Sequence, residues 1–243
     1  MRLYIEDNLA ADRPVTLTAA HAHYLRNVMR AGPGDKVLLF NGRDGEWDAA
    51  IDSLRKNSGS ALPRAQRRPQ RDEPGPWLLF APLKRSSQDF LIQKAVELGV
   101  AALQPVRTEY TNTGRINRDR MVAHAIEAAE QCERLTVPEV REIEKHTFLL
   151  ENWPQDRYLL VCAERGAAQP IDEVLRAAPE TGAWGILTGP EGGFASSELE
   201  QLRTLPFVRM VSLGPRILRA ETAAIAALTC WQSVLGDWDD HRP

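Results

Sequence analysis

Two stretches near the carboxyl end of the chain decide the fold: Thr188-Gly189-Pro190-Glu191-Gly192-Gly193-Phe194 and Leu213-Gly214-Pro215-Arg216-Ile217-Leu218-Arg219-Ala220-Glu221-Thr222-Ala223. Each follows a continuous apolar run, residues 184–188 and 208–213. Such runs are typical of strands covered on both faces of a sheet. Ligands of open α/β sheets bind beyond the carboxyl ends of the strands, so the two turns are candidates for a binding site. Glycine also lets backbone N–H and C=O groups approach a flat ligand such as adenine.

The chain from residue 77 onward alternates between strand and helix patterns. A Ser197-x-x-Glu200 pattern predicts a capping box that opens one further helix. This alternation indicates an α/β domain with a mostly parallel sheet. Strands are expected at 78–81, 102–106, 158–162, 184–188 and 208–213, and helices at 87–98, 118–134 and 220–235.

The first part of the chain has a different pattern of short strands and turns. Strands are expected at 3–5, 15–17, 37–40 and 47–51, and one short helix at 19–29. This pattern fits a small β-barrel with one helix. Residues 57–76 lack periodicity, so we expect the boundary there, with domains at 1–72 and 73–243.

Composition is that of an ordinary globular protein, with 43% hydrophobic and 26% charged residues. The first residues do not resemble a signal peptide, and no apolar run reaches the roughly 20 residues of a membrane-spanning helix. We therefore expect a cytoplasmic protein without a membrane partner. Cys132, Cys162 and Cys230 are far apart, which predicts buried thiols rather than a zinc site or a disulfide framework.

Charge is unevenly distributed along the chain. Residues 1–72 carry 12 Lys and Arg against 9 Asp and Glu, although the whole chain has a net charge of −3. The stretch 55–71 contains six basic residues and no acidic one. Such a stretch attracts phosphate. The alternative is a solvated, flexible linker.

Several common site motifs are missing from the sequence. There is no GxGxxG after a first strand, no GxxxxGK[ST] and no GxSxG. A dinucleotide fold, a P-loop and a hydrolase nucleophile are therefore unsupported. A metal-free site built from backbone and one or two charged side chains remains.

The sequence GPEGGF at 189–194, followed by LGPRILRAETA at 213–223, resembles the paired signature of the SPOUT methyltransferases that modify uridine N3 in 16S ribosomal RNA. Residues 94–100, 129–134 with Pro138, and 23–30 leading into Gly34-Asp35 also match that family, in the same order. The departures are Thr188, where an aliphatic residue is usual, and Met29, where leucine is usual.

This resemblance implies a trefoil-knotted SPOUT-type domain, one of the rare exceptions to unknotted topology, behind a PUA-like RNA-binding barrel. It also implies S-adenosyl-L-methionine as the cofactor, a homodimer, and a small-ribosomal-subunit substrate methylated at uridine 1498 of 16S ribosomal RNA to give 3-methyluridine. The implied cofactor-binding residues are Leu187, Gly189, Gly192, Leu213, Gly214, Ile217, Leu218 and Thr222.

Three charged residues are candidates for catalysis. Uracil N3 must lose its proton, and negative charge then spreads onto O2 and O4. Arg219 is the candidate for stabilising that charge, since its guanidinium stays protonated. Glu191 and Glu221 are candidates for orienting the base or accepting the proton. Alternatively, Glu221 only favours the dipole in the first turn of a helix, and Glu191 only pairs with a neighbouring arginine.

Basic and polar residues elsewhere are candidates for RNA contact. His23, Arg26 and Arg30 have spacings that can share one helical face, and so do Gln131 and Arg134. Alternatively, His23 is a capping or core residue, and Gln131 and Arg134 reach the dimer partner or are a plain exposed pair. The full set is His23, Tyr24, Arg26, Arg30, Arg64, Arg67, Arg68, Lys84, Arg85, Gln131 and Arg134.

Three other readings remain open. The chain could be a SPOUT methyltransferase acting on another RNA site, such as a ribose 2′-oxygen or tRNA. It could be a catalytically silent RNA-binding or ribosome assembly factor. It could also be an unrelated α/β enzyme that binds a nucleotide phosphate in its glycine loops.

Overall fold

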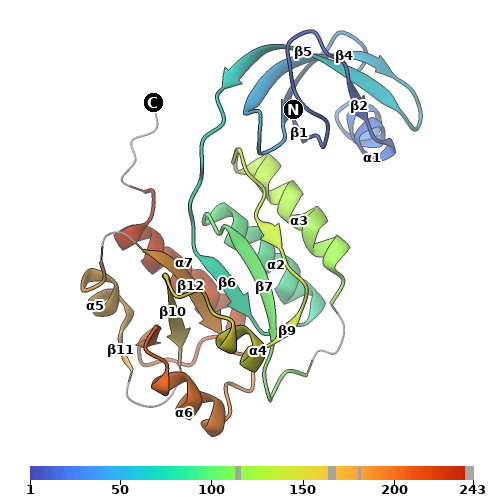
Figure 1. The fold of residues 1–243 in the computed structure, drawn as a ribbon. Coiled ribbons are helices and arrows are strands. Elements are labelled where there is room, and N and C mark those ends of the chain that lie inside the picture. Colours follow the sequence, from blue (N-terminus) through green and yellow to red (C-terminus); the bar gives the residue numbers. More distant parts are fainter. Residues whose placement is uncertain (113–115, 164–167, 180–181, 239–243) are drawn as a thin grey trace. The chain divides into compact units, whose positions relative to one another are not determined.

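The computed structural model describes residues 1–112, 116–163, 168–179 and 182–238 of the chain (Figure 1). It divides into two compact units, Met1–Glu73 with Ala129–Val137, and Pro74–Ala128 with Pro138–Pro243. The first unit therefore resembles the expected domain 1–72 but also includes a segment from much later in the chain.

The first unit is built on a five-stranded sheet in the order β1-β3-β4-β5-β2. Strands β1 and β3 pair in parallel, and the other pairs are antiparallel. No ladder among the described residues joins β1 to β2, so the expected barrel is open at that edge. The core contains Leu3, Leu17, Leu25, Leu39 and Ile51. The strands are β1 (Arg2–Tyr4), β2 (Val15–Leu17), β3 (Lys36–Phe40), β4 (Glu46–Leu54) and β5 (Gly59–Arg68).

Strand β5 corrects the expectation of an irregular linker at 57–76. It pairs with both β4 and β2. Its pairing with β4 contains several register shifts. Pro63 has no backbone N–H and so cannot donate a hydrogen bond within the sheet. From Arg64 onward its side chains are mostly exposed. These irregularities remove the period-two pattern by which a strand is recognised in sequence.

The expected helix at 19–29 is two shorter elements, α1 (Ala19–His23) and the π-helix η1 (Tyr24–Val28). Thr18 caps α1 by accepting a hydrogen bond from the backbone N–H of His21. Arg30 follows the end of η1 with a φ of 54°. The helical spacing that grouped Arg30 with His23 and Arg26 therefore does not apply.

A buried carboxylate in β4 organises one side of the first unit. The Glu46 side chain is 3% exposed and lies 2.7 Å from the Arg2 guanidinium and 2.8 Å from that of Arg68. The same two arginines donate to backbone carbonyls of the segment 129–137: Arg2 to those of Ala129 and Arg134, and Arg68 to that of Glu133. These contacts hold the segment on the sheet.

Glu73 makes a second set of bonds to the segment 129–137. Its carboxylate accepts hydrogen bonds from the backbone N–H groups of Leu135 and Thr136 and from the Thr136 hydroxyl. It also pairs with Arg134, whose side chain is 6% exposed. Burial, which raises the pKa of Glu73, is outweighed by these hydrogen bonds and the arginine, so the pKa lies below its usual value.

The second unit contains an eight-stranded sheet in which every pair is parallel, as the alternating pattern predicts. The order is β11-β13-β10-β12-β6-β7-β8, and β9 also pairs with β7. Its strands are β6 (Trp77–Phe80), β7 (Ala102–Arg107), β8 (Glu139–Val140), β9 (Glu144–Lys145), β10 (Arg157–Cys162), β11 (Gln169–Pro170), β12 (Ala183–Thr188) and β13 (Val208–Ser212).

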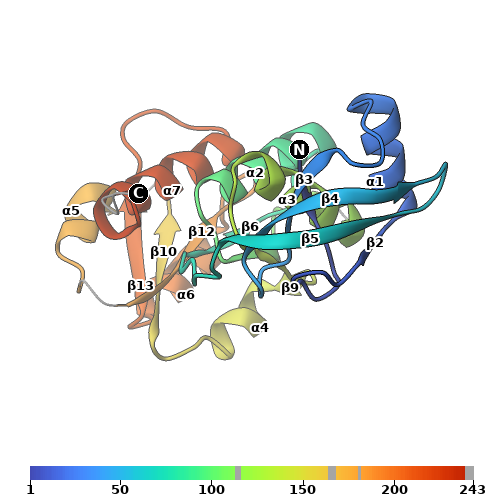
Figure 2. The same ribbon diagram turned by 90° about the horizontal axis from the view of Figure 1, so that it is seen from above.

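Helices cover both faces of this sheet (Figures 1 and 2). Helices α2 and α5 both pack against α7, and α7 packs on β12, whereas α6 packs on β13. The helix bounds are α2 (Arg85–Glu97), α3 (Arg118–Gln131), α4 (His146–Glu151), α5 (Ile171–Arg176), α6 (Ser196–Thr204) and α7 (Ala220–Leu235).

Helices α6 and α3 each differ from expectation at one end. Helix α6 begins after Ala195, and Glu198 accepts the Ala195 N–H, so the predicted Ser197/Glu200 capping box is wrong by two residues. Helix α3 ends at Gln131, so Arg134 lies outside the helix and does not share a helical face with Gln131.

The strand order places β10 between β12 and β13. In register, Cys162 at the end of β10 lies opposite Thr188 of β12 and Val211 of β13. The loops that follow β12 and β13 therefore start on either side of the end of β10. Whether the chain between them is threaded as a trefoil knot stays a prediction. In the described part of the chain, no helix is long and apolar enough to span a membrane.

Candidate active site

A cavity of about 450 Å³ lies at the carboxyl ends of β10, β12 and β13. Both glycine loops line it, so the structure brings together the two stretches that the sequence singled out. Its walls are residues 188–194 and 213–218, with Cys162, Ala163, Ser196, Leu199, Ala220 and Ala223.

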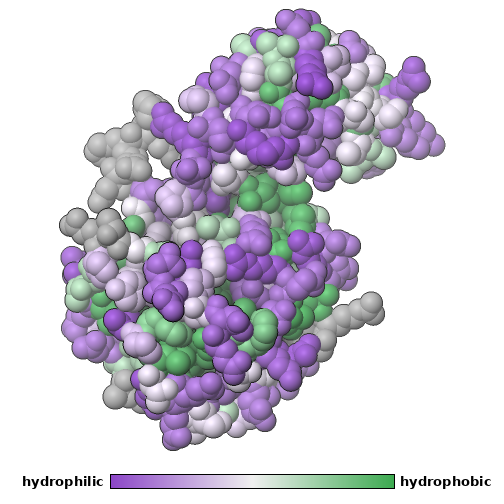
Figure 3. Space-filling model, viewed as in Figure 1, coloured by the Kyte–Doolittle hydropathy of each residue, from purple (hydrophilic) through white to green (hydrophobic). Residues whose placement is uncertain are grey.

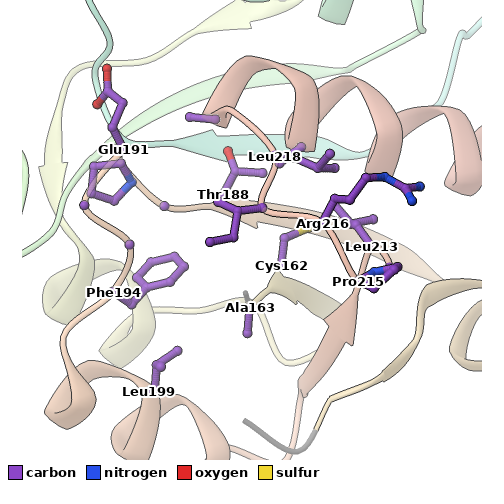
Figure 4. A pocket seen from close by; sticks show the side chains of 18 of the residues that line it. Cys162, Ala163, Thr188, Glu191, Phe194, Leu199, Leu213, Pro215, Arg216 and Leu218 are labelled. Carbon is purple, nitrogen blue, oxygen red and sulfur yellow. The ribbon is translucent and has the colours of Figure 1, made fainter. Parts of the chain in front are cut away.

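Apolar side chains face each other across the cavity. Figure 4 shows Phe194 and Leu199 on one side and Leu213 and Leu218 on the other, with Ala163 between them. A flat, apolar group can be enclosed between such walls, and backbone atoms of the glycine loops supply the polar contacts.

Two glycines allow the backbone to form this cavity. Gly214 has a φ of 100°, a conformation that side-chain-bearing residues rarely adopt. A Cβ on Gly189 would lie 3.0 Å from the ring of Phe194, so the ring packs directly on the backbone of the loop. The loop after β12 is thus shaped by its own aromatic residue.

Most of the proposed cofactor residues reach the cavity. Leu187 does not line it, because it is buried within β12 with 2% exposure. Thr222 is exposed on the first turn of α7 and is not part of the wall. The residues that do line it are Gly189, Gly192, Leu213, Gly214, Ile217 and Leu218.

Sequence reasoning did not assign several wall residues to the site, among them Cys162, Phe194, Leu199 and Arg216. Phe194 and Arg216 stand inside the two quoted motifs, so their position next to the glycines was a usable signal. Cys162 and Leu199 reach the cavity through the strand order and through the packing of α6, which no local pattern reveals. Burial raises the pKa of the Cys162 thiol to about 12, so it stays protonated at neutral pH.

The three proposed catalytic residues have different surroundings. Glu191 lines the cavity, and Figure 4 shows its carboxylate pointing away from Phe194. Arg219 is the N-cap residue of α7 and has an exposed side chain. Glu221 lies in the first turn of α7 and accepts a hydrogen bond of 3.2 Å from the Ser87 hydroxyl of α2. Neither Arg219 nor Glu221 lines the cavity wall.

Behind the glycine loop lies a buried carboxylate, Glu198, whose side chain is 5% exposed. It accepts hydrogen bonds from the backbone N–H groups of Ala195 at 2.8 Å and Glu109 at 2.9 Å. The Nδ1 atom of His146 lies 3.3 Å from the same carboxylate.

The basic residues of β5 are engaged in ion pairs within the first unit. Arg64 pairs with Asp12 at 2.7 Å, and Arg67 lies 3.8 Å from both Glu46 and Asp48. Exposed ion pairs such as Arg64–Asp12 contribute little to folding stability. A phosphate group can therefore replace the Asp12 carboxylate as the partner of Arg64 at a small cost in free energy. Arg68 differs, because its partner Glu46 is buried.

The remaining residues proposed to contact RNA are mostly exposed. His23, Arg26 and Arg30 are accessible around η1, Tyr24 is partly buried, and Gln131 is exposed at the end of α3. Lys84 and Arg85 are exposed at the start of α2, the helix whose Ser87 bonds Glu221. Arg134 is the exception: its burial against Glu73 leaves it little access to a ligand. For all of them, RNA contact stays a prediction.

Among the described residues, no group of three His, Cys, Asp or Glu side chains is arranged to hold a metal ion. Within the part of the chain that the structure describes, the charged groups that line the cavity are one carboxylate, Glu191, and one guanidinium, Arg216.

Comparison with known proteins supports a common family for both units. Residues 73–232 match a family model described as an RNA methyltransferase domain, and residues 17–61 match one described as an RNA methyltransferase PUA domain. These matches confirm the PUA-like character expected of the first unit.

Named relatives and solved structures agree. The chain is 34% identical to a ribosomal RNA small subunit methyltransferase E from Rickettsia conorii, with 93% of each chain covered. A crystal structure of ribosomal RNA small subunit methyltransferase E from Neisseria gonorrhoeae bound to S-adenosyl methionine is similar with a TM-score of 0.85, at 31% identity and 98% coverage of both chains. A Legionella pneumophila methyltransferase in complex with the same cofactor has a TM-score of 0.85 at 27% identity, with 96% of each chain covered.

Proposed function

As a member of the ribosomal RNA small subunit methyltransferase E family, the chain is, we propose, an S-adenosyl-L-methionine-dependent enzyme that methylates N3 of a uridine in 16S ribosomal RNA. The target follows from the resemblance of its two signature loops: uridine 1498 of the small subunit, converted to 3-methyluridine.

The observation that carries this proposal is the meeting of both glycine loops in one cavity at the end of β10. The residues present fit the cofactor. Leu213, Leu218 and Phe194 offer apolar walls for an adenine, and the backbone of the loops offers donors and acceptors. Glu191 and Arg216 have charges opposite to those of the cofactor's cationic and carboxylate groups.

When bound, the cofactor supplies an electrophilic methyl group on a positively charged sulfur. The work of the chain is to hold the uracil in line with that group, since alignment alone lowers a barrier substantially. Arg219, exposed at the start of α7, stabilises the negative charge on the uracil carbonyl oxygens. Glu191, at the cavity wall, orients the base or accepts the N3 proton, and Glu221 shares this assignment.

RNA binding is assigned mainly to the first unit. Its PUA-family match and its exposed His23, Arg26 and Arg30 support this role. The target uridine must leave its stack to enter the cavity, because a base within a stack cannot expose N3 to a cofactor bound at strand ends.

The test is to mix the protein with labelled S-adenosyl-L-methionine and undermethylated small subunits, and then to map the labelled nucleotide. Label at N3 of uridine 1498 is the expected result. Label elsewhere would make the chain a methyltransferase for another site. Cofactor binding without transfer would favour a silent assembly factor, and failure to bind the cofactor would overturn the proposal.

We also propose that the protein acts as a homodimer in the cytoplasm, where ribosomal subunits are found. The family resemblance supports both statements. Figure 3 shows hydrophobic surface among the hydrophilic surface of the second unit, and Phe90, Phe148 and Ile217 of this unit are large exposed apolar residues. Sedimentation equilibrium at micromolar concentration would give twice the chain mass for a dimer and the single mass otherwise.

A further inference from the structure

We propose that Glu198 is a positioning residue for cofactor binding: from outside the cavity, it fixes the loop 189–195 to the turn that follows β7. The inference rests on the proposed function of the cavity. Glu198 itself does not line the cavity, so its effect must pass through the loop that does.

Glu198 uses its two oxygens on two different parts of the chain. Oε2 accepts the N–H of Ala195, the last residue of the glycine loop, at 2.8 Å. Oε1 accepts the N–H of Glu109, which follows β7, at 2.9 Å. Capping of α6 needs only the first of these bonds. The second bond ties Glu198, and through it the loop, to the turn after β7, and capping of the helix does not require it.

The turn that contains Glu109 is itself held by hydrogen bonds. Thr108 is buried, its backbone N–H donates to the Thr111 hydroxyl at 2.9 Å, and its carbonyl accepts the Thr111 N–H at 3.2 Å. Residues 108–111 therefore form a closed turn at the end of β7. Glu109 presents its N–H to Glu198 from within this turn.

The same turn also touches the glycine loop directly. A Cβ on Gly192 would lie 3.3 Å from the Cβ of Tyr110, so Tyr110 packs on the backbone of that glycine. His146 adds a further contact, with Nδ1 3.3 Å from Glu198 Oε1 and 3.3 Å from the carbonyl oxygen of Arg107. The Glu198 carboxylate is thus shared by α6, α4 and the turn after β7.

A buried carboxylate that accepts backbone N–H bonds holds them strongly, because charged hydrogen bonds are stronger than neutral ones. Replacing it with the amide of the same shape leaves one acceptor oxygen for two N–H groups. Either the Ala195 N–H or the Glu109 N–H then loses its acceptor. The loop is therefore no longer held in the binding conformation before the cofactor arrives. Only the fraction of molecules with an ordered loop binds, so the apparent affinity falls.

The test compares Glu198→Gln with Glu200→Gln, an exposed glutamate on the same helix. We expect Glu198→Gln to raise the dissociation constant and KM for S-adenosyl-L-methionine about tenfold, the effect of one lost charged hydrogen bond. The kcat at saturating cofactor and the KM for small subunits should stay close to those of the unchanged chain. Glu200→Gln should change none of them.

Hydrogen–deuterium exchange of the cofactor-free protein gives a second readout. Residues 189–195 and 109–111 should exchange faster in Glu198→Gln than in Glu200→Gln. If Glu198→Gln does not fold, Glu198→Asp, which keeps the charge but is one carbon shorter, is measured in the same way.

A lower melting temperature with unchanged cofactor affinity at 25 °C would overturn the inference, because it would leave Glu198 a purely structural role. Failure of the unchanged chain to bind the cofactor would instead refute the proposed function itself. If the unchanged chain binds the cofactor without methyl transfer, the dissociation constants of Glu198→Gln and Glu200→Gln still decide the inference: an equal affinity of the two variants would overturn it.

Discussion

Arg219 and Glu191 are both charged residues of the signature loops, but only Glu191 lines the cavity wall. Arg219 caps α7 with its backbone in an extended conformation and directs an exposed side chain outward. This position suits contact with an RNA base that arrives from outside better than contact with a cofactor within the cavity.

Substitution of Arg219 tests this difference. We expect Arg219→Ala to lower kcat by about 100- to 1000-fold, the usual cost of removing one group that stabilises transition-state charge. Cofactor affinity, measured by calorimetry, should change little. Arg203→Ala, which removes an exposed arginine of α6, serves as the control. If only cofactor binding is lost, Arg219 belongs to the cofactor site and not to the catalytic residues.

Glu46 gives a prediction about acid stability. Burial raises the pKa of its carboxyl, but the hydrogen bonds and charges of Arg68 and Arg2 outweigh burial and hold the pKa below its ordinary value of 4.5. The stabilisation is therefore present above that value and is lost as the pH falls through the lower pKa of the folded state.

Glu46→Gln should cost about 3 kcal/mol of unfolding free energy at pH 7, because Arg2 and Arg68 lose their buried partner. Its stability should also depend less on pH between about 5 and 3 than that of the unchanged chain. Urea unfolding followed by circular dichroism at several pH values measures both effects. Asp48→Asn, at an exposed site of the same strand, should resemble the unchanged chain.

At the level of elements, the sequence predicts the second unit better than the first. Helix α7 begins and ends at the expected residues, and the five strands of the parallel sheet that the sequence predicts (β6, β7, β10, β12 and β13) lie within a residue of expectation, because continuous apolar runs identify buried strands. The two-residue strands β8, β9 and β11 were not predicted, because they are too short to form such a run. Strand β5 escaped recognition because its exposed arginines and register shifts hide the alternation. The π-helical turn η1 was also unpredictable, since its sequence reads as an ordinary helix.

Close packing before β6 yields another prediction. A Cβ on Gly75 would lie only 1.9 Å from the backbone carbonyl oxygen of Gly99, at the end of α2. Backbone cannot move aside as a side chain can. Gly75→Ala should therefore lower the unfolding free energy by about 1–3 kcal/mol.

The control for this change is Gly182→Ala, where the added Cβ would lie at ordinary contact distances from side chains, 3.5 Å from the Tyr158 ring and 3.7 Å from Trp184 Nε1. Urea midpoints of the two variants should differ clearly. Equal midpoints would mean that the chain at Gly75 shifts without cost.

On the scale of the whole molecule, the sign of the net charge changes along the chain. The first 72 residues carry 12 basic against 9 acidic residues, whereas the whole chain has a net charge of −3. Because phosphate contacts release counterions, affinity for small subunits should fall steeply with salt. Replacing Arg26 and Arg30 by Gln should reduce the slope of log affinity against log salt by about 1.5.

The same titration with Arg13→Gln, an exposed arginine of the first unit that we do not assign to RNA, gives the control. A slope that is unchanged in the double variant would show that the residues around η1 do not contact phosphate.

The cavity could be predicted from the sequence in part, because the glycines and leucines of its walls stand in two recognisable motifs. The contribution of Cys162 depends on β10 lying between two strands that follow it in the chain. The role of the segment 129–137 in the first unit was also hidden. It depends on contacts such as that between Arg2 and the Ala129 carbonyl, which join residues far apart in sequence and leave no periodic trace.

That segment has a consequence for how the protein is made. Translation releases Met1–Glu73 well before Ala129–Val137, although both belong to the same unit. While the ribosome is still adding α2 and β7, Arg2 and Arg68 lack the carbonyl oxygens that they hold in the finished molecule. The N-terminal portion is therefore completed late in biosynthesis, and a stop codon placed after residue 73 would yield a fragment with an unfinished surface.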